Sequence, residues 1–233
     1  GEVATRRARL PGGSVTQQIA AMGADGVPII AALSALLGMT IAFQTIVQLQ
    51  PFGATLFVAD AIGLSMVREL APLVAAIILT GRTGAAIAAE LGTMRVRSEI
   101  DALSAMGVSP VRFLVVPRLL AITVAGPALA LIAMAIAILG GMVVAAAVVD
   151  MPPASFWARV VERVTMGDFV HGLSKSFVFA WIVGLTGAHF GLRAGGDAGS
   201  VGAATTRAVV AGISLIIIVD GIFATASSLW EAP

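Results

Sequence analysis

The sequence predicts an all-α membrane protein with about five transmembrane helices. Of its 233 residues, 58% are hydrophobic and 12% are charged, and the charged share is about half that of an average soluble domain. The mean hydropathy is +1.00. Apolar residues gather in runs of about 20 or more, the length of a helix that crosses the hydrocarbon core of a bilayer. Several such runs indicate a multi-pass protein.

The composition argues against several classes of protein and site. The chain contains no cysteine, so disulfides and cysteine metal sites are excluded. A net charge of +1 gives no sign of nucleic-acid binding. His171 and His189 would lie at opposite ends of one helix, too far apart to share a metal ion. No nucleophile elbow and no GxxxxGK[ST] phosphate loop occurs. We therefore expect no catalytic residue, metal site or cofactor, and any ATP must be hydrolysed by another subunit.

Residues 1–26 are predicted to form a polar tail followed by an interfacial elbow helix. Ser14 could cap a short helix that runs through Met22 with its apolar residues on one face. The segment lacks the apolar core of a signal peptide. A disordered tail is the alternative.

The first two spans are predicted at about 27–47 and 69–91. Gln44 lies in the first span, where it would face a partner helix or a cavity rather than lipid, so it is a candidate cavity residue. Gln-Pro-Phe-Gly at 50–53 predicts a turn. The moderately apolar residues 54–67 predict a short helix that only dips into the membrane.

The third apolar run is too long for one upright span. Residues 113–149 would measure about 55 Å as a helix, against a hydrocarbon core of about 30 Å. No polar turn divides the run, so we prefer one long, tilted span at about 117–149 over two shorter ones.

The last two spans are predicted at about 170–192 and 208–230. An amphipathic connector precedes them at 150–168, and a Gly-rich polar loop at 193–207 separates them. The fourth span carries small residues at spacings of three and four, which predict close helix packing: Gly184, Gly187 and Gly191.

A polar segment after the second span, at about 95–107, has a helical pattern. Its apolar residues recur at helical spacing, and Gly107 and Pro110 supply a stop, so it predicts a surface helix with one apolar face. A loop lying on the lipid headgroups is the alternative. The charged residues of this segment are Arg95, Arg97, Glu99 and Asp101.

The distribution of Lys and Arg predicts the orientation. With a cytoplasmic N-terminus, ten of these residues lie inside and four outside, as the positive-inside rule requires. Five spans then put the C-terminus outside and the segment 95–107 inside. The inside residues are Arg6, Arg7, Arg9, Arg82, Arg95, Arg97, Arg112, Arg118, Arg193 and Arg207, and the outside residues are Arg68, Arg159, Arg163 and Lys175.

Charged residues within the spans are the strongest candidates for a functional site, because burying a charge in lipid costs about 2.5 to 3.5 kcal/mol even on insertion scales. Glu69 and Lys175 would lie at similar depth near the outer surface. Lys175 could instead reach Asp220 in the fifth span. We predict that these residues line the outer half of a substrate cavity; the alternative is a pair that only neutralises buried charge and fixes helix register.

Two blocks of sequence carry a family resemblance. The first block contains RELAP, GRTGAAIAAELGTM and EIDALSAMGVSPVRFLVVPRLLA, and the second is LSKSFVFAWIVGLTGAHFGLRAGGDAGSVGAATTRAVV. Both resemble the MlaE family of membrane permeases, which serve ABC transporters associated with MCE-domain lipid carriers. Residues 27–233 are thus similar to an MlaE permease domain.

The resemblance implies a function and a set of partners. The segment 95–107 would be the coupling helix that docks on a cytoplasmic ABC ATPase. The substrate would be a phospholipid, exchanged between the bacterial inner membrane and a periplasmic MCE-domain protein, in service of outer-membrane lipid asymmetry or envelope lipid traffic. Some relatives carry or recruit a STAS domain. The implied coupling residues are Arg95, Arg97, Glu99, Asp101 and Gly107.

Five spans are few to enclose a path for a lipid, so we expect a homodimer with the cavity at its two-fold axis. Two other functions remain open: an ion-coupled secondary transporter of an amphipathic substrate, with Glu69, Lys175 and Asp220 as the relay, and a structural membrane anchor for an MCE assembly.

Overall fold

The computed structural model describes residues 12–231, and every regular element in that range is a helix. Residues 1–11, which include Arg6, Arg7 and Arg9, lie outside the described residues. Within residues 12–231, five helices are long and apolar enough to cross a membrane, so the predicted fold class is confirmed. Their bounds are Thr16–Phe52, Phe57–Val96, Val111–Val149, Met166–Leu192 and Gly199–Ser227.

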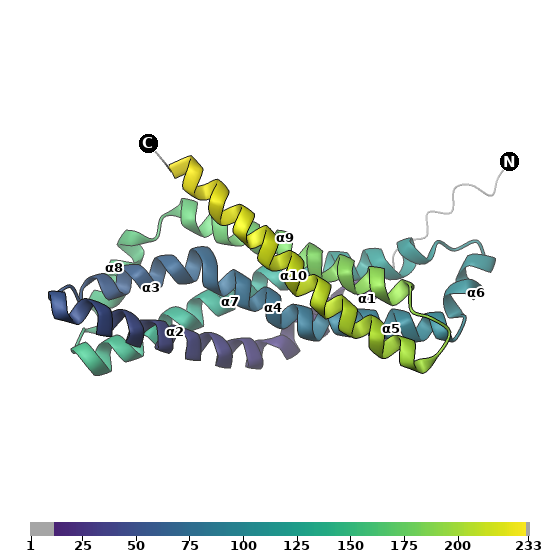
Figure 1. Cartoon of the computed structure of the whole chain (residues 1–233), viewed down its shortest axis with the longest axis horizontal. Coiled ribbons are helices and arrows are strands. Elements are labelled where there is room, and N and C mark those ends of the chain that lie inside the picture. The colour runs from purple at the N-terminus through teal and green to yellow at the C-terminus, as the bar shows by residue number, and fades with distance from the viewer. Residues whose placement is uncertain (1–11, 232–233) are drawn as a thin grey trace.

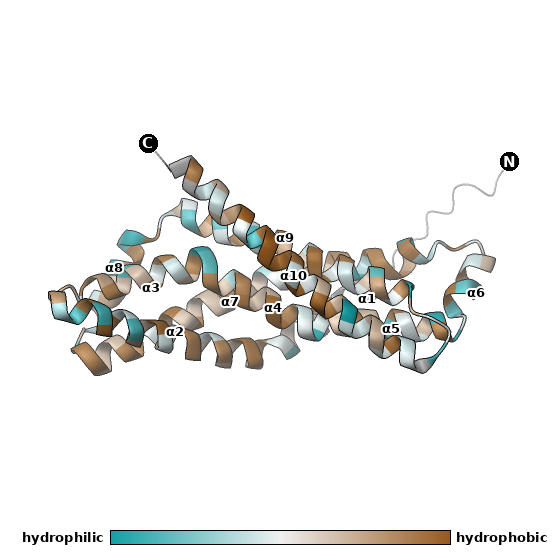
Figure 2. Ribbon diagram, in the orientation of Figure 1, coloured by the Kyte–Doolittle hydropathy of each residue, from teal (hydrophilic) through white to brown (hydrophobic). Residues whose placement is uncertain are grey.

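The helices form one elongated bundle, with α6 at one end and α8 at the other, and α10 crosses the bundle obliquely (Figure 1). Hydrophilic positions gather mainly toward the two ends and hydrophobic ones between them (Figure 2), as a membrane-spanning bundle requires. In chain order the segments are α1 (Gly12–Gly23), η1 (Ala24–Gly26), α2 (Val27–Leu49), η2 (Gln50–Phe52), α3 (Phe57–Ser65), η3 (Met66–Leu70), α4 (Ala71–Leu79), η4 (Thr80–Gly84), α5 (Ala85–Val96), α6 (Glu99–Ala105), η5 (Val111–Val115), α7 (Val116–Val149), α8 (Pro153–Arg163), α9 (Met166–Leu192) and α10 (Ala198–Glu231).

The second spanning helix begins at Phe57 rather than at Glu69, because α3, η3, α4, η4 and α5 join into one continuous helix. The short separate helix expected at 54–67 is therefore the first part of this span. Pro72 does not break the helix, since the turn before it, η3, is a wide π-helical turn in which Ala71 donates to the Met66 carbonyl.

The fifth spanning helix also begins earlier than predicted. The glycine-rich segment was expected to be a loop over 193–207, but α10 starts at Ala198 and continues through the segment. The Asp197 side chain accepts a hydrogen bond from the Ser200 backbone N–H at 2.9 Å, which satisfies an otherwise unpaired donor at the helix start. The stabilisation that the cap and the following alanines give to the helix exceeds the free-energy cost of placing the glycines of the segment in it.

The polar segment at 95–107 is divided into two helices. The last turn of α5 contains Arg95, and Ser98 then adopts a left-handed conformation at φ 59° that turns the chain into α6. Gly107, at φ 75°, ends the segment as predicted. Only the residues from Glu99 to Ala105 therefore form the helix exposed at this end of the bundle.

Small residues hold the spanning helices at close range. A Cβ atom on Gly38 of α2 would lie 1.9 Å from the Ala137 carbonyl oxygen of α7. On α9, a Cβ on Gly172 would lie 2.0 Å from the Val67 carbonyl oxygen of η3. The predicted close packing of span four is present, because Gly187 and Gly191 lie against the backbone of the second spanning helix. Backbone contact fixes the register of α2, α7 and α9.

Replacing Gly38 by Ala should lower the stability of the fold by about 1 to 3 kcal/mol, because the new methyl group would overlap backbone and force α2 and α7 apart. The measurement is the thermal unfolding midpoint of the purified protein in detergent. Gly202→Ala is the matched control: its Cβ would meet nothing within 4 Å, so the midpoint should stay or rise. An unchanged midpoint for Gly38→Ala would disprove the close contact.

Candidate functional site

The structure brings Glu69, Lys175 and Asp220 together from three spanning helices. Lys175 on α9 is fully buried, and its ammonium contacts Glu69 Oε2 of η3. Its Nζ also lies 2.5 Å from Asp220 Oδ1 of α10, an ion pair that lacks the alignment of a hydrogen bond. Both carboxylates that sequence reasoning offered as alternatives are thus partners of the same ammonium.

Local structure positions this ion triad. α9 begins with a capping box in which Thr165 and Asp168 exchange hydrogen bonds, at 3.2 Å from Asp168 N to Thr165 Oγ1 and 2.9 Å from Thr165 N to Asp168 Oδ2. Arg68 Nη1 lies 3.3 Å from Asp168 Oδ1 and so ties η3 to the start of α9. Lys175 follows about 15 Å further along the helix, beside Glu69.

His171 joins the same site, although the sequence placed it only at one end of the fourth predicted span. Its Nε2 lies 3.8 Å from Glu69 Oε1, and its ring packs edge-on against Phe223 of α10 with the centroids 5.8 Å apart. The signal that could have found it is spacing, because His171 stands four residues before Lys175, on the same helix face.

The charges of the ion triad do not cancel. One ammonium faces two carboxylates, which leaves one negative charge in an environment of low polarity. A protonated His171 would balance the four groups. Such a site can attract a cationic group, exchange a proton or hold three helices in register.

Gln44, predicted to face the cavity, does not join the ion triad. It is exposed on α2, a helix that packs mainly against α7.

The predicted coupling residues lie at the opposite end of the bundle, around α6 (Figure 1). There Arg95 pairs with Asp101 at 2.5 Å and Arg97 approaches Glu99 at 4.0 Å, and all four side chains are solvent-accessible. Across residues 12–231, no group of three or more His, Asp or Glu side chains is placed to hold a metal ion.

Replacing Lys175 by Met should destabilise the protein by about 3 to 5 kcal/mol, since it leaves Glu69 and Asp220 facing each other without a cation. The triple variant Glu69→Gln/Lys175→Met/Asp220→Asn should recover most of this loss, because no buried charge remains unpaired. Thermal unfolding in detergent measures both. A single variant that unfolds at the wild-type temperature would show that the ion triad contributes nothing to stability.

Comparison with known proteins identifies the family. The family model "Permease MlaE" matches residues 15–226. A probable ABC transporter permease protein of Rickettsia conorii is 34% identical over 204 residues, which are 88% of this chain and 79% of the relative. A probable ABC transporter permease protein of Synechocystis is 34% identical over 202 residues, 87% of this chain and 77% of the relative. The chloroplastic protein TRIGALACTOSYLDIACYLGLYCEROL 1 of Arabidopsis thaliana is 29% identical over 204 residues, 88% of this chain and 58% of the relative. The chain therefore belongs to the MlaE family of ABC transporter permeases.

Proposed function

We propose that this protein is the permease subunit that moves phospholipids between the bacterial inner membrane and a periplasmic MCE-domain partner, with ATP hydrolysed on a separate subunit. The ion triad is the observation that carries this proposal: three charged side chains are kept inside an apolar bundle, about one third of the way along α9. Charges kept at such a cost mark the path of a substrate more often than they serve packing alone.

A lipid is the substrate class that suits this arrangement. An apolar bundle with a few charged groups near one end matches a molecule with acyl chains and a polar headgroup. The name of the Arabidopsis relative contains that of a glycolipid, trigalactosyldiacylglycerol. From the name of this relative we take only that the substrate of the present protein is a lipid.

The ATPase is proposed to dock at the α6 end. This end holds most of the arginines of the described chain, so the positive-inside rule assigns it to the cytoplasm. α6 exposes Glu99 and Asp101, and the neighbouring Met106 is an exposed apolar side chain. A short helix with an apolar contact and flanking charges fits a groove on a soluble partner.

A homodimer with the cavity at its two-fold axis would complete the path. α10 contributes Asp220 to the ion triad, yet one side of this helix is exposed and apolar along much of its length. Within a membrane such a face contacts either lipid or another helix. The second copy would place two ion triads around one cavity. The large exposed apolar residues of the described part of α10 are Val210, Leu215, Ile217, Ile218, Ile222 and Leu229.

Ion-coupled secondary transport is the second candidate, and His171 is the observation that favours it. Three titratable groups and a lysine in one network could relay a proton or exchange a cation. ATP dependence separates the two functions: transport driven by an ion gradient, without an added ATPase, would favour the second.

The triple variant Glu69→Gln/Lys175→Met/Asp220→Asn should reduce lipid transport at least about tenfold while remaining assembled, because the charges that contact substrate are gone and helix packing is preserved. The assay reconstitutes the permease with its ATPase and MCE partner in vesicles and follows a labelled phospholipid. Asp60→Asn/Arg159→Gln is the matched control, since it removes another ion pair, 2.6 Å long, between α3 and α8. Wild-type transport by the triple variant would reduce the ion triad to a structural role.

Met106→Asp should abolish co-purification of the ATPase without changing the unfolding midpoint, because a charge replaces an exposed apolar contact beside α6. Met166→Asp makes the same change at an exposed methionine near α8 and should retain the ATPase. Equal recovery of ATPase with both variants would place the docking surface elsewhere.

A further inference from the structure

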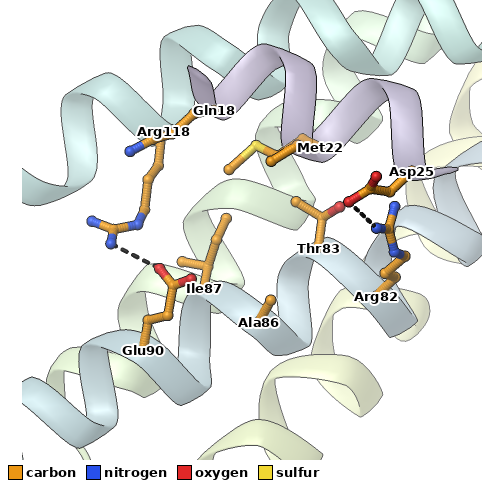
Figure 3. A pocket seen from close by; sticks show the side chains of 10 residues that line it. Gln18, Met22, Asp25, Arg82, Thr83, Ala86, Ile87, Glu90 and Arg118 are labelled. Atoms are coloured by element: carbon orange, nitrogen blue, oxygen red, sulfur yellow. Dashed lines mark hydrogen bonds and ion pairs between the residues drawn. The ribbon is translucent and has the colours of Figure 1, made fainter. Parts of the chain in front are cut away.

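A second charged cavity lies far from the ion triad, between α1 and the η4 and α5 part of the second spanning helix. Its volume is about 230 Å³, room for roughly eight water molecules at ~30 Å³ each. Gln18 and Met22 of α1 form one wall, and Ile87 lies on the opposite wall (Figure 3). One ion pair bounds each end: Arg82 Nη2 lies 3.1 Å from Asp25 Oδ2, and Arg118 Nη2 lies 2.9 Å from Glu90 Oε2.

The two ion pairs are asymmetric in the same sense. The Arg118 side chain is 13% exposed and its Glu90 partner 61%, while the Arg82 side chain is 38% exposed and its Asp25 partner 67%. Arg118 is further anchored because its Nη1 donates to the Leu114 carbonyl at 2.7 Å. Arg118 is therefore fixed in the wall, and Arg82 is less exposed than its partner, whereas the carboxylates can turn into water at little cost, as exposed partners do. A ligand anion could replace either carboxylate.

Two side chains that line the cavity also carry polar atoms without partners. Gln18 Oε1 and Arg82 Nη1 are buried, and neither has a hydrogen-bond partner among the described residues. Arg82 Nη1 lies beside Gly26, at the edge of the cavity. A buried acceptor and a buried donor are normally satisfied, so both point to a ligand that can donate and accept hydrogen bonds.

We propose that this cavity binds the headgroup of a phospholipid that carries a primary ammonium. The phosphate would pair with Arg118 or Arg82, since arginine matches phosphate in a forked geometry. The ammonium would donate to Gln18 Oε1 and to the displaced carboxylates. A quaternary ammonium has no N–H for Gln18, and a headgroup with net negative charge would be repelled by Asp25 and Glu90.

The lipid source follows from the position of the cavity. Met22 and Ile87 give it apolar walls, and the residues of α1 from Thr16 on belong to the first spanning helix. Basic pockets between spanning helices on the cytoplasmic side are typical headgroup sites. Arg82 is thirteen residues from Glu69 on one helix, about 20 Å away, so this is a second lipid site. It goes beyond the proposed transport function, because binding needs neither ATP nor a partner.

The test is native mass spectrometry of the purified full chain in detergent, titrated with phosphatidylethanolamine, phosphatidylcholine and phosphatidylglycerol of identical acyl chains. Wild type should bind phosphatidylethanolamine about tenfold more tightly than phosphatidylcholine, the difference expected from one unmatched buried acceptor, and more tightly than phosphatidylglycerol, which Asp25 and Glu90 repel. Gln18→Leu should abolish the preference over phosphatidylcholine. Gln17→Leu, at the exposed neighbouring position that does not line the cavity, should retain it.

Glu90→Gln provides a second variant whose side chain is exposed, so folding is preserved while the preference for the ammonium falls. Equal binding of the three lipids by wild type, or loss of preference in Gln17→Leu, would overturn the proposal. Free phosphoethanolamine should compete poorly with phosphatidylethanolamine for the cavity. Competition as effective as that of the lipid would assign the cavity to a soluble phosphate ester and overturn the lipid assignment. None of these outcomes depends on transport.

Discussion

The buried ammonium of Lys175 constrains the structure around it. A charge that is fully removed from solvent must be paired, and the two carboxylates that pair it come from different helices, Glu69 from η3 and Asp220 from α10. α9 cannot slide or rotate against either helix without leaving a charge unsatisfied. Because the buried ammonium must stay paired, the ion triad fixes the register of three spanning helices near the α8 end.

Close backbone packing makes that register possible. Lys175 reaches Glu69 because α9 touches η3 at Gly172, where even one methyl group would overlap the Val67 carbonyl. The π-helical turn of η3 has a similar effect, since it widens the helix where Glu69 must turn toward α9. Small residues therefore serve the charged site indirectly: van der Waals contact between backbones sets the distances over which the charges interact.

The two ends of the bundle use charge in opposite ways. Near α8, the central cation is buried and both of its partners are partly buried, so the network is rigid and expensive to disturb. Toward α6, the cations Arg82 and Arg118 are less exposed than their partners Asp25 and Glu90, which are largely exposed. Exposed carboxylates are weak partners that exchange readily with other anions. The first arrangement suits a permanent structural role, and the second leaves the carboxylates free to change partners.

The sequence by itself determined the class of the protein, the number of spans, the exposed polar segment before Gly107 and the charged residues of the ion triad. These features depend on run length, local pattern and residue type, which the chain carries directly.

The earlier start of α10 reflects two opposing local effects: the Asp197 cap stabilises the helix start by more than the nearby glycines destabilise it. Only the tertiary structure decided that Lys175 binds both carboxylates, that His171 joins them and that Gln44 does not. It also decided that Arg82 pairs with Asp25 and Arg118 with Glu90 across a cavity. Such pairings join residues far apart in the chain, and their distances follow from how closely the helices pack, which no single stretch of sequence specifies.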